Sequence, residues 1–314
     1  MAEVSPGHAQ AVVANLRQLL AAGSRAPATR DAYDRQQRAY TRWCEQAGYP
    51  GQAPEPYLVA AYLVHQVQAG RALSTVRVVR AALVQWDCAL QAEGVLPSGG
   101  VGLRDHPLVG EAMKMAGRLA VPVVRQMLPV GVALLQAVLA ALQRHQRSEF
   151  LRDTALLLLG WAGMFRCSEL AAMRWESVWF EERGLRILVP FSKTDQAGAG
   201  QWVFIGASAA LQPAAALQAL GAFVGSASGP VFPSALGSEV AMAKQTVTLR
   251  LRQALLLAGV PRAQLPLCAA HSLRRGGATH AAQQGASLRH IMLHGRWKSD
   301  AVRRLPVHQL RGGI

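Results

Sequence analysis

Five polar or aromatic residues of the C-terminal half interrupt apolar stretches, and their types suit the binding of a phosphate group. Arg166 follows the apolar run ALLLLGWAGMF, and Lys193 lies in the turn-forming stretch SKTDQ. His271 and Arg274 are three residues apart in HSLRRGGATH and would face one side of a helix. Trp297 follows in HGRWKSD. Together their side chains could surround one phosphodiester and neutralise the charge that grows on its oxygens during displacement.

Each of these residues, taken alone, also has a purely structural explanation. Arg166 could pair with Glu169 one helical turn later. Lys193 could be a solvated turn residue, His271 a histidine satisfied within the core, and Trp297 a packing residue. The occurrence of all five in one chain favours a common site.

The charge of the chain points to a polyanionic partner. The 314 residues carry a formal net charge of +15, with a sequence pI near 10.9. The first 116 residues hold 11 basic and 9 acidic side chains, whereas the remainder holds 22 and 9. All but four basic residues are arginine, whose planar guanidinium binds phosphate with two hydrogen bonds. This excess predicts a polyanionic partner, although a GC-rich gene would also raise the arginine content.

Three further features narrow the class of protein. The apolar run Thr154–Phe165 is shorter than the roughly 20 residues that a membrane span needs, so we predict no membrane association. The N-terminal sequence MAEVSPGHAQ lacks a basic region followed by an apolar core, which predicts no secretory signal and an intracellular location. The four cysteines lack paired spacing, which predicts free thiols.

The elements that would carry these residues fall into two parts. In the first part, apolar periodicity predicts helices, with Thr29 and Ser74 as N-caps of two of them. The predicted helices cover residues 11–22, 29–48, 57–68, 74–94 and 107–118. Residues 119–129, with Pro122 and Pro129 and no clear period, are the best linker candidate.

The second part mixes helices with a hairpin. Residues 185–191 and 202–205 are β-rich and are joined by the glycine-containing stretch 192–200. Helices are predicted over residues 130–146, 152–164, 211–224, 240–258, 272–284 and 288–293. The sequence therefore predicts a mainly α protein with a small β-hairpin, composed of a helical domain 1–118, a linker 119–129 and a mixed α/β domain 130–314.

Taken in order, these motifs resemble those of the tyrosine recombinases, also called the phage-integrase family. The long segment HSLRRGGATHAAQQGASLRHIMLHGRWKSDA is similar to the C-terminal signature of its mobile-element branch, retrotransposon-type and Crypton-like. FRCSEL resembles the first-arginine motif, PFSKTDQAGAG the hairpin lysine motif and HSLR the His-x-x-Arg motif. TRDAYDRQQRAYTRWCEQAG and LSTVRVVRAALVQW resemble the helical, SAM-like core-binding domain.

The resemblance implies a role for each candidate residue in DNA strand transfer. Arg166 and Arg274 would bind the scissile phosphate, and Lys193 would protonate the departing 5′ oxygen. His271 would orient the phosphate and help to move the proton of the nucleophile, and Trp297 would donate its indole N–H to a phosphate oxygen. The family needs no metal and no nucleotide cofactor, because the phosphodiester energy is held in a covalent phosphotyrosine.

The sequence departs from the family pattern at the attacking tyrosine. In similar chains the tyrosine follows the tryptophan at a position that is held here by Leu305 or Pro306. All five tyrosines lie within the first 62 residues, and Ser299 and His308 are the nearby alternative nucleophiles. We therefore predict that catalysis is impaired, in a copy that is decayed, truncated or alternatively ended.

The resemblance also implies double-stranded DNA as the partner and a homo-oligomer, a dimer or tetramer, on that DNA. A nuclear location would follow in a eukaryote, and a cytoplasmic or nucleoid location in a bacterium. For the helix that begins near Ser74, an ordinary solvated face is an equally good explanation of the basic residues. The candidate DNA contacts are Arg71, Thr75, Arg77 and Arg80 in the first domain and Arg275 and Lys298 in the second.

Three other functions remain open on the sequence. A metal-binding module could use Cys268, His271, His290 and His294, although their spacing is longer than in common zinc fingers, and we predict no metal site. A non-catalytic repressor or architectural DNA-binding protein would differ from a recombinase at the nucleophile alone. A protein that binds RNA or ribosomes through charge would explain the composition but not the ordered motifs.

Overall fold

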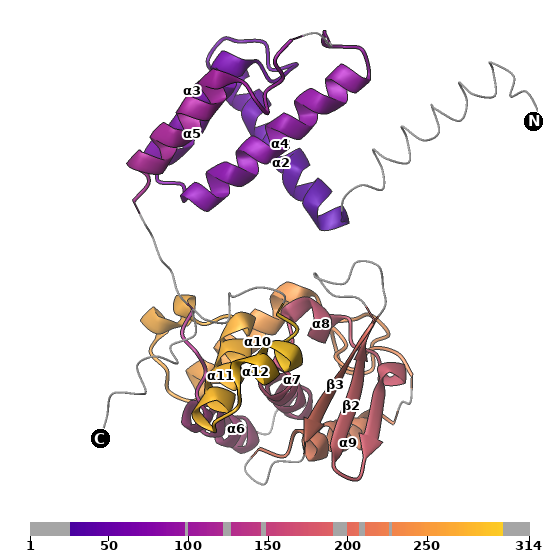
Figure 1. The fold of residues 1–314 in the computed structure, drawn as a ribbon. Helices are drawn as coiled ribbons and strands as arrows, with labels where there is room; N and C mark the ends of the chain where they lie inside the picture. Colours follow the sequence, from indigo (N-terminus) through magenta and orange to yellow (C-terminus); the bar gives the residue numbers. More distant parts are fainter. Residues whose placement is uncertain are drawn as a thin grey trace, which may run out of the picture. The chain divides into compact units, whose positions relative to one another are not determined.

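The computed structural model describes residues 26–97, 100–121, 127–145, 149–190, 200–206, 211–225 and 228–297. The chain divides into two compact units, Met1–Val124 and Arg125–Ile314 (Figure 1). The boundary between the units falls inside residues 119–129, the range predicted as a linker. The helix predicted over residues 11–22 lies outside the described residues.

Unit 1 is helical in its described part. Its helices are α2 (Pro27–Gln46), α3 (Pro56–Gln68), α4 (Leu73–Ala92) and α5 (Pro107–Leu119). All but α4 begin with proline, whose fixed φ suits the first helical position and whose missing N–H would have no partner there. α3 and α5 lie side by side in Figure 1, and the helices enclose one core of aliphatic and aromatic side chains.

The two predicted helix caps are wrong. α2 already begins at Pro27, so Thr29 lies within its first turn. The Ala72 carbonyl accepts the first backbone hydrogen bonds of α4, which places Ser74 inside the helix as well. Neither helix has a side-chain hydrogen bond at its N-cap. Proline in the first case, and an extended alanine in the second, start the helix without a hydroxyl.

Unit 2 combines helices with a small sheet. The helices are α6 (Val132–His145), α7 (Phe150–Ala162), α8 (Cys167–Ala171), α9 (Pro213–Val224), α10 (Lys244–Leu257), α11 (Ala270–Gln283) and α12 (Leu288–Gly295). The strands are β1 (Val178–Glu181), β2 (Gly184–Val189) and β3 (Gln201–Gly206), antiparallel in the order β1-β2-β3. The prediction of a mainly α protein with a small sheet is confirmed.

The predicted hairpin corresponds to β2 and β3, with Leu185 opposite Ile205 and both side chains buried. The third strand, β1, was not predicted. Its sequence VWFE is short and mostly exposed, so it lacks the alternation of buried and exposed residues that marks a strand. α8 was also missed, because five residues hold too little periodicity to be recognised.

α7 is the central element of unit 2. Leu156 and Leu159 pack in one hydrophobic cluster with the sheet and α9, whereas Leu157 and Leu158 pack in a second cluster with α6 and α10. A helix that is apolar on all sides must be covered on all sides, and α7 contacts α6, α9, α10 and α11. Residues at either end of α7 are therefore held in fixed surroundings.

Two glycines let α11 approach α7 closely. A Cβ atom at Gly276 would overlap the carbonyl oxygen of Val130, and one at Gly277 would overlap the carbonyl oxygen of Trp161. The indole N–H of Trp161 donates to the same Val130 carbonyl at 2.8 Å. The Gly-Gly pair of HSLRRGGATH thus brings the first turns of α11 against the end of α7.

Within the described part of the chain, no helix combines the length and the apolar character that a membrane crossing requires.

Candidate functional site

α8 presents the first of the predicted site arginines. The chain leaves α7, buries Phe165 and places Arg166 at the N-cap of α8. The Arg166 guanidinium donates to Glu169 Oε1 at 2.5 Å, and its backbone N–H donates to Oε2 at 2.9 Å. The pair that would explain Arg166 structurally is therefore present. The arginine side chain is 19% exposed and the carboxylate 2%, so the cation alone reaches solvent.

α11 carries the second arginine into the same region. Arg274 is 1% exposed, and its guanidinium donates to the carbonyl oxygens of Met164 and Gly295. It also lies over the indole of Trp297, 3.9 Å from the ring centroid. Burial, followed by the charges of Arg166 and Arg296, lowers the pKa of Arg274 to about 9, which still leaves the guanidinium charged at neutral pH.

His271 lies one turn before Arg274 at the start of α11, where its ring reaches the surface. Partial removal from water, followed by the positive charges of Arg274, Arg275 and Arg166, lowers the pKa of the imidazole. At neutral pH the ring is therefore uncharged and able to accept a proton.

Arg296 was not predicted, although it lies at the centre of the cluster. Its side chain is 2% exposed and donates to Glu169 Oε2 at 2.8 Å, opposite the oxygen that Arg166 binds through its guanidinium. It also donates to the carbonyl oxygens of Gly163 at 3.3 Å and Met164 at 3.1 Å. These three partners are more than a hundred residues away from Arg296 in sequence, so no local sequence pattern predicts the contacts.

The cluster carries a surplus of positive charge. Among its described residues, three guanidiniums, those of Arg166, Arg274 and Arg296, face one buried carboxylate, that of Glu169. Burial of Glu169 opposes its ionisation, but Arg296 and Arg166 outweigh burial and hold its pKa below the ordinary value. One carboxylate cannot neutralise three cations, so the cluster is suited to take up an anion with several oxygen acceptors.

The structure brings together Arg166, Arg274 and Trp297, with His271 electrostatically coupled to both arginines. Arg275 follows on α11 and is half-buried. Its Nε–H is enclosed without an acceptor among the described residues. The remaining predicted positions of this region lie outside the described residues: Lys193, Lys298 and Leu305, with Ser299, Pro306 and His308.

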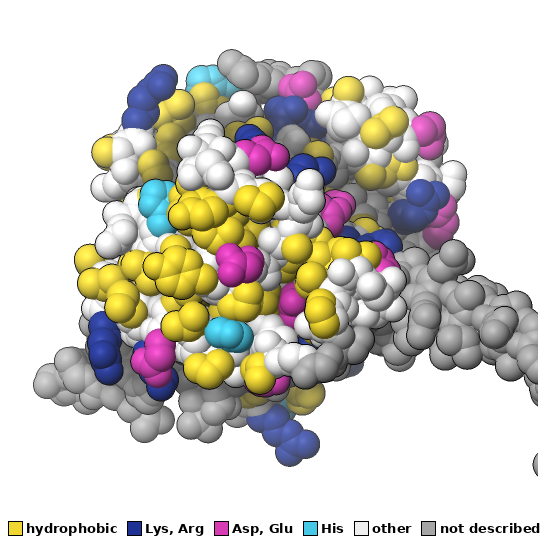
Figure 2. Space-filling model, turned by 90° about the horizontal axis from the view of Figure 1, so that it is seen from above, with side chains coloured by type: hydrophobic (Ala, Val, Ile, Leu, Met, Phe, Trp, Pro, Cys, Tyr) yellow, Lys and Arg dark blue, Asp and Glu magenta, His cyan; other side chains and the backbone are white. Residues whose placement is uncertain are grey.

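The predicted DNA contacts of unit 1 lie in and just before α4. Arg71 and Arg77 are exposed, and Thr75 is half-buried. Arg80 donates to the carbonyl oxygen of Arg104 at 2.6 Å, so part of its guanidinium holds a loop of the same unit. The view of Figure 2 shows basic and acidic side chains interspersed with hydrophobic ones. Charge alone therefore does not mark a DNA-binding face in this view.

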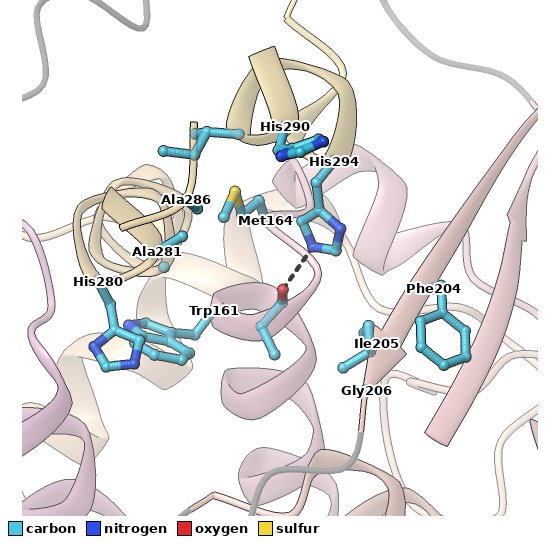
Figure 3. Close-up of a pocket in the computed structure, with 13 residues that line it drawn as sticks. Trp161, Met164, Phe204, Ile205, Gly206, His280, Ala281, Ala286, His290 and His294 are labelled. Carbon is cyan, nitrogen blue, oxygen red and sulfur yellow. Dashed lines mark hydrogen bonds between the residues drawn. The ribbon is translucent and has the colours of Figure 1, made fainter. Parts of the chain in front are cut away.

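The metal-binding alternative finds no support in the described residues, which hold no group of three or more histidine, cysteine, aspartate or glutamate side chains placed to share a metal. Cys268 is buried in a hydrophobic cluster. His294 and the Ala162 carbonyl oxygen lie 2.8 Å apart (Figure 3). Burial, more than the nearby arginines, lowers the pKa of His294, so the neutral ring donates its Nε2–H to that carbonyl.

A cavity of about 360 Å³ lies between α7, β3, α11 and α12 (Figure 3). Its wall is mainly apolar, with Met164, Phe204 and Ile291 among the lining residues, and His280, His290 and His294 supply polar groups. Met164 belongs to both the arginine cluster and the cavity, because its carbonyl oxygen accepts hydrogen bonds from Arg274 and Arg296 while its side chain lines the cavity.

All tyrosines of the chain lie in unit 1. Tyr40 and Tyr62 are buried in its core, with ring centroids 5.4 Å apart, and burial raises the pKa of both phenols. A raised pKa disfavours the phenolate that would attack phosphorus. These two residues therefore serve packing.

Comparisons with known proteins found a matching family and a related sequence. Residues 133–308, more than half of the chain, match the Phage integrase family. An integrase/recombinase xerD homolog from Selenomonas ruminantium is 29% identical over 290 residues, which cover 89% of this chain and 81% of that protein.

Solved structures share the fold at low sequence identity. Lambda integrase bound to DNA has a TM-score of 0.61 at 16% identity, covering 97% of this chain and 98% of that one. The Tn1549 transposon integrase in complex with transposon right end DNA has a TM-score of 0.61 at 13% identity, covering 90% of each chain. XerH recombinase bound to difH substrate has a TM-score of 0.55 at 15% identity, covering 81% of this chain and 67% of that one.

Proposed function

The chain belongs to the phage integrase family, the tyrosine recombinases, and we propose from this membership that it binds double-stranded DNA and serves DNA integration and recombination. The observation that carries the proposal is the convergence of Arg166 and Arg274, from separate motifs, in a cluster with more positive than negative charge. A phosphodiester supplies the oxygen acceptors and the negative charge that such a cluster lacks.

In the proposed reaction, each side chain acts on one scissile phosphate. Arg166 and Arg274 bind the non-bridging oxygens, and Trp297 donates its indole N–H to one of them. A nucleophilic hydroxyl attacks phosphorus and gives its proton to the neutral His271, while the bond to the 5′ oxygen breaks. Lys193 protonates that departing oxygen. The reverse sequence, with a new 5′ hydroxyl as the attacking group, completes strand transfer without a metal or a nucleotide.

We propose that the chain itself does not supply the nucleophile. Leu305 and Pro306 occupy the expected position of the tyrosine, and neither carries a hydroxyl. The burial of Tyr40 and Tyr62 in unit 1 supports this reading, because neither is available as a substitute. Under this proposal the natural chain binds DNA and its strand-transfer chemistry is impaired.

The experiment that tests the chemistry uses nicked suicide duplexes, which trap a covalent intermediate. A pool of randomised duplexes is incubated with the natural chain, with Leu305→Tyr and with Leu305→Phe, and covalent adducts are resolved on denaturing gels. Phenylalanine is the matched control, because it has the ring of tyrosine without the hydroxyl. We expect an adduct with Leu305→Tyr alone.

An adduct with the natural chain would contradict the missing nucleophile, and peptide mapping would then identify the attacking residue. An adduct with Leu305→Phe would show that another group attacks. If no variant reacts but all bind duplex DNA in a way that requires Arg274, the chain is a non-catalytic DNA-binding protein. That second function, a repressor or architectural factor, is favoured by the confinement of all tyrosines to the first 62 residues.

The remaining assignments follow from family membership. We propose that unit 1 is the SAM-like core-binding domain, with Arg71, Thr75, Arg77 and Arg80 contacting the DNA backbone, and that Arg275 and Lys298 add backbone contacts from unit 2. Related structures include a lambda integrase dimer bound to a COC′ core site and a tetramer bound to a Holliday junction. We therefore propose a homo-oligomer on DNA, located with the DNA in the nucleoid or the nucleus.

A further inference from the structure

Arg296 adopts a backbone conformation that arginine does not favour. Its φ of 58° and ψ of 41° lie in the left-handed region, where the Cβ atom crowds the backbone. Only Met164 and Gln212 share a positive φ among the described non-glycine residues. The side chain of Arg296 must therefore make interactions that offset the strain.

Those interactions link two segments of the site that are distant in sequence. The Arg296 guanidinium binds Glu169 at 2.8 Å and the carbonyl oxygens of Met164 at 3.1 Å and His294 at 2.9 Å. It also lies over the Phe165 ring, 4.8 Å from the centroid. These contacts bind the segment after α12 to the segment between α7 and α8.

The backbone around Arg296 holds both phosphate-binding candidates. The Arg296 carbonyl oxygen accepts a hydrogen bond from Arg166 at 3.0 Å, and the preceding Gly295 carbonyl oxygen accepts one from Arg274. Glycine at position 295 leaves room for the Trp297 ring, which a Cβ atom there would overlap. Two consecutive carbonyls of one turn thus orient the two arginines.

We propose that Arg296 is a positioning residue that neutralises Glu169 and so leaves the Arg166 guanidinium available to a phosphate. This inference rests on the proposed function. Glu169 is shared, since Arg166 binds one carboxylate oxygen through its side chain and Arg296 binds the other. The carboxylate is 2% exposed, so water screens it poorly. Without Arg296, the whole charge of Glu169 would act on Arg166 and would compete with the phosphate for it.

The probe for this proposal is inorganic phosphate, titrated by calorimetry into the full chain. We expect Arg296→Gln to lower phosphate affinity by about tenfold or more, the effect of losing one charge-assisted hydrogen bond at Arg166. We expect the double variant Arg296→Gln/Glu169→Gln to recover most of that affinity. It has the same net charge as the unaltered chain and no longer contains the carboxylate that holds Arg166.

The double variant separates charge compensation from a merely structural role. If Arg296 only maintained the fold, removing Glu169 as well would not restore phosphate binding. Unchanged affinity in a folded Arg296→Gln chain, or no recovery in the double variant, would overturn the proposal. If Arg296→Gln does not fold by circular dichroism, Arg296→Lys takes its place. Lysine keeps a positive charge beside Glu169, so phosphate affinity should stay within a few-fold of that of the unaltered chain, and a loss of about tenfold in the folded lysine chain would overturn the proposal.

A reference variant distinguishes failure of this inference from failure of the proposed function. Arg274→Gln removes a proposed phosphate ligand and reports how much of the measured binding belongs to the site. If Arg274→Gln changes neither phosphate nor duplex DNA affinity, the proposed function fails together with the inference. If it lowers both and the Arg296 series is flat, the inference alone fails.

Discussion

Unit 2 buries charged side chains in two places, and the buried carboxylate has its pKa shifted in opposite directions at the two places. At the start of α7, Arg152 is fully buried and pairs with Asp153 at 3.2 Å, while Arg250 lies 3.8 Å from the same carboxylate. Beyond the end of α7, Arg166 and Arg296 hold Glu169 at 2.5 and 2.8 Å. Burial raises the pKa of Asp153 despite its arginines, whereas the pKa of Glu169 is lowered despite its burial.

The comparison shows that a buried arginine does not by itself mark a functional site. Arg152 is fully buried beside its own carboxylate, and its guanidinium donates to Asp153 and to the Pro233 carbonyl. Arg166, in contrast, keeps part of its side chain in solvent, and the exposed His271 is coupled to it. The solvent exposure of Arg166 and His271 distinguishes the candidate site from the structural ion pair.

The largest expected effect is a loss of folding stability when the Arg152–Asp153 ion pair is broken. Arg152→Gln leaves Asp153 buried without its closest cation and should lower the free energy of unfolding by about 3–5 kcal/mol. Denaturant unfolding measures this change. The double variant Arg152→Gln/Asp153→Asn removes both charges and should lose less, and an equal or greater loss would contradict a pairing role for Arg152.

The next effect concerns the rate of covalent adduct formation, which should depend on Arg274 but not on Arg152. In the Leu305→Tyr chain, Arg274→Gln should lower the rate of covalent adduct formation by about 10²–10³-fold, as expected when a donor to the developing charge is removed. Single-turnover assays on the suicide duplex measure the rate. Arg152→Gln is the matched control at a temperature where it remains folded. A similar rate loss in both variants would mean that the two buried arginines do not differ in function.

The pH dependence of stability should have opposite signs at the two carboxylates. The pKa of Glu169 is lowered in the folded chain, so its ionisation stabilises the fold above the ordinary value of 4.5 and this contribution is lost as the pH falls. The unfolding free-energy difference between the unaltered chain and Glu169→Gln should therefore shrink below about pH 4.5.

Asp153 should show the reverse trend. Its folded pKa is raised above 3.8, so its ionisation opposes folding and the unaltered chain gains stability, relative to Asp153→Asn, as the pH falls toward 3.8. Unfolding curves of both variants between pH 3 and 7 measure the two slopes. Slopes of the same sign would show that the two carboxylates are in equivalent surroundings.

The smallest effect concerns unit 1. Replacing the exposed Arg71 and Arg77 by glutamine should weaken duplex binding only a few-fold at moderate salt. It should reduce the dependence of the logarithm of the affinity on the logarithm of salt concentration by roughly 0.9 for each DNA phosphate that is no longer neutralised. Replacing the exposed Arg38 of α2 is the matched control. An unchanged salt dependence would remove these residues from the proposed interface.

Sequence reasoning found the parts of the site that depend on local motifs. Arg166 and Arg274 stand out because each interrupts an apolar stretch, and Trp297 stands out within a long signature. It missed Arg296, because the partners of this residue are distant in sequence and its left-handed backbone is not marked by glycine. The apolar helix before FRCSEL was recognised, but no sequence pattern could show that the carbonyls of Gly163 and Met164, just past its end, would accept hydrogen bonds from arginines.

The same limit applies to the fold. Amphipathic helices such as α2 and α5 carry enough periodicity to be predicted, whereas β1 is short and exposed and owes its existence to pairing with β2. Helix starts were misplaced at Thr29 and Ser74, because hydroxyl residues are common N-caps; at α2 the start signal is Pro27, two residues earlier. Elements without a strong local pattern, such as β1, are determined by their pairing with distant parts of the chain.

The two clusters of charged residues lie at opposite ends of α7, so the dipole of this helix interacts with both of them. Peptide dipoles aligned along a helix leave a partial positive charge at its start and a partial negative charge at its end. Asp153 lies in the first turn, and at the other end the carbonyls of Ala162 and of the C-cap residue Gly163 accept hydrogen bonds from His294 and Arg296. The macrodipole of α7 therefore acts as a counterion that cannot be protonated, so the arginine cluster keeps part of its compensation at any pH and before any anion arrives.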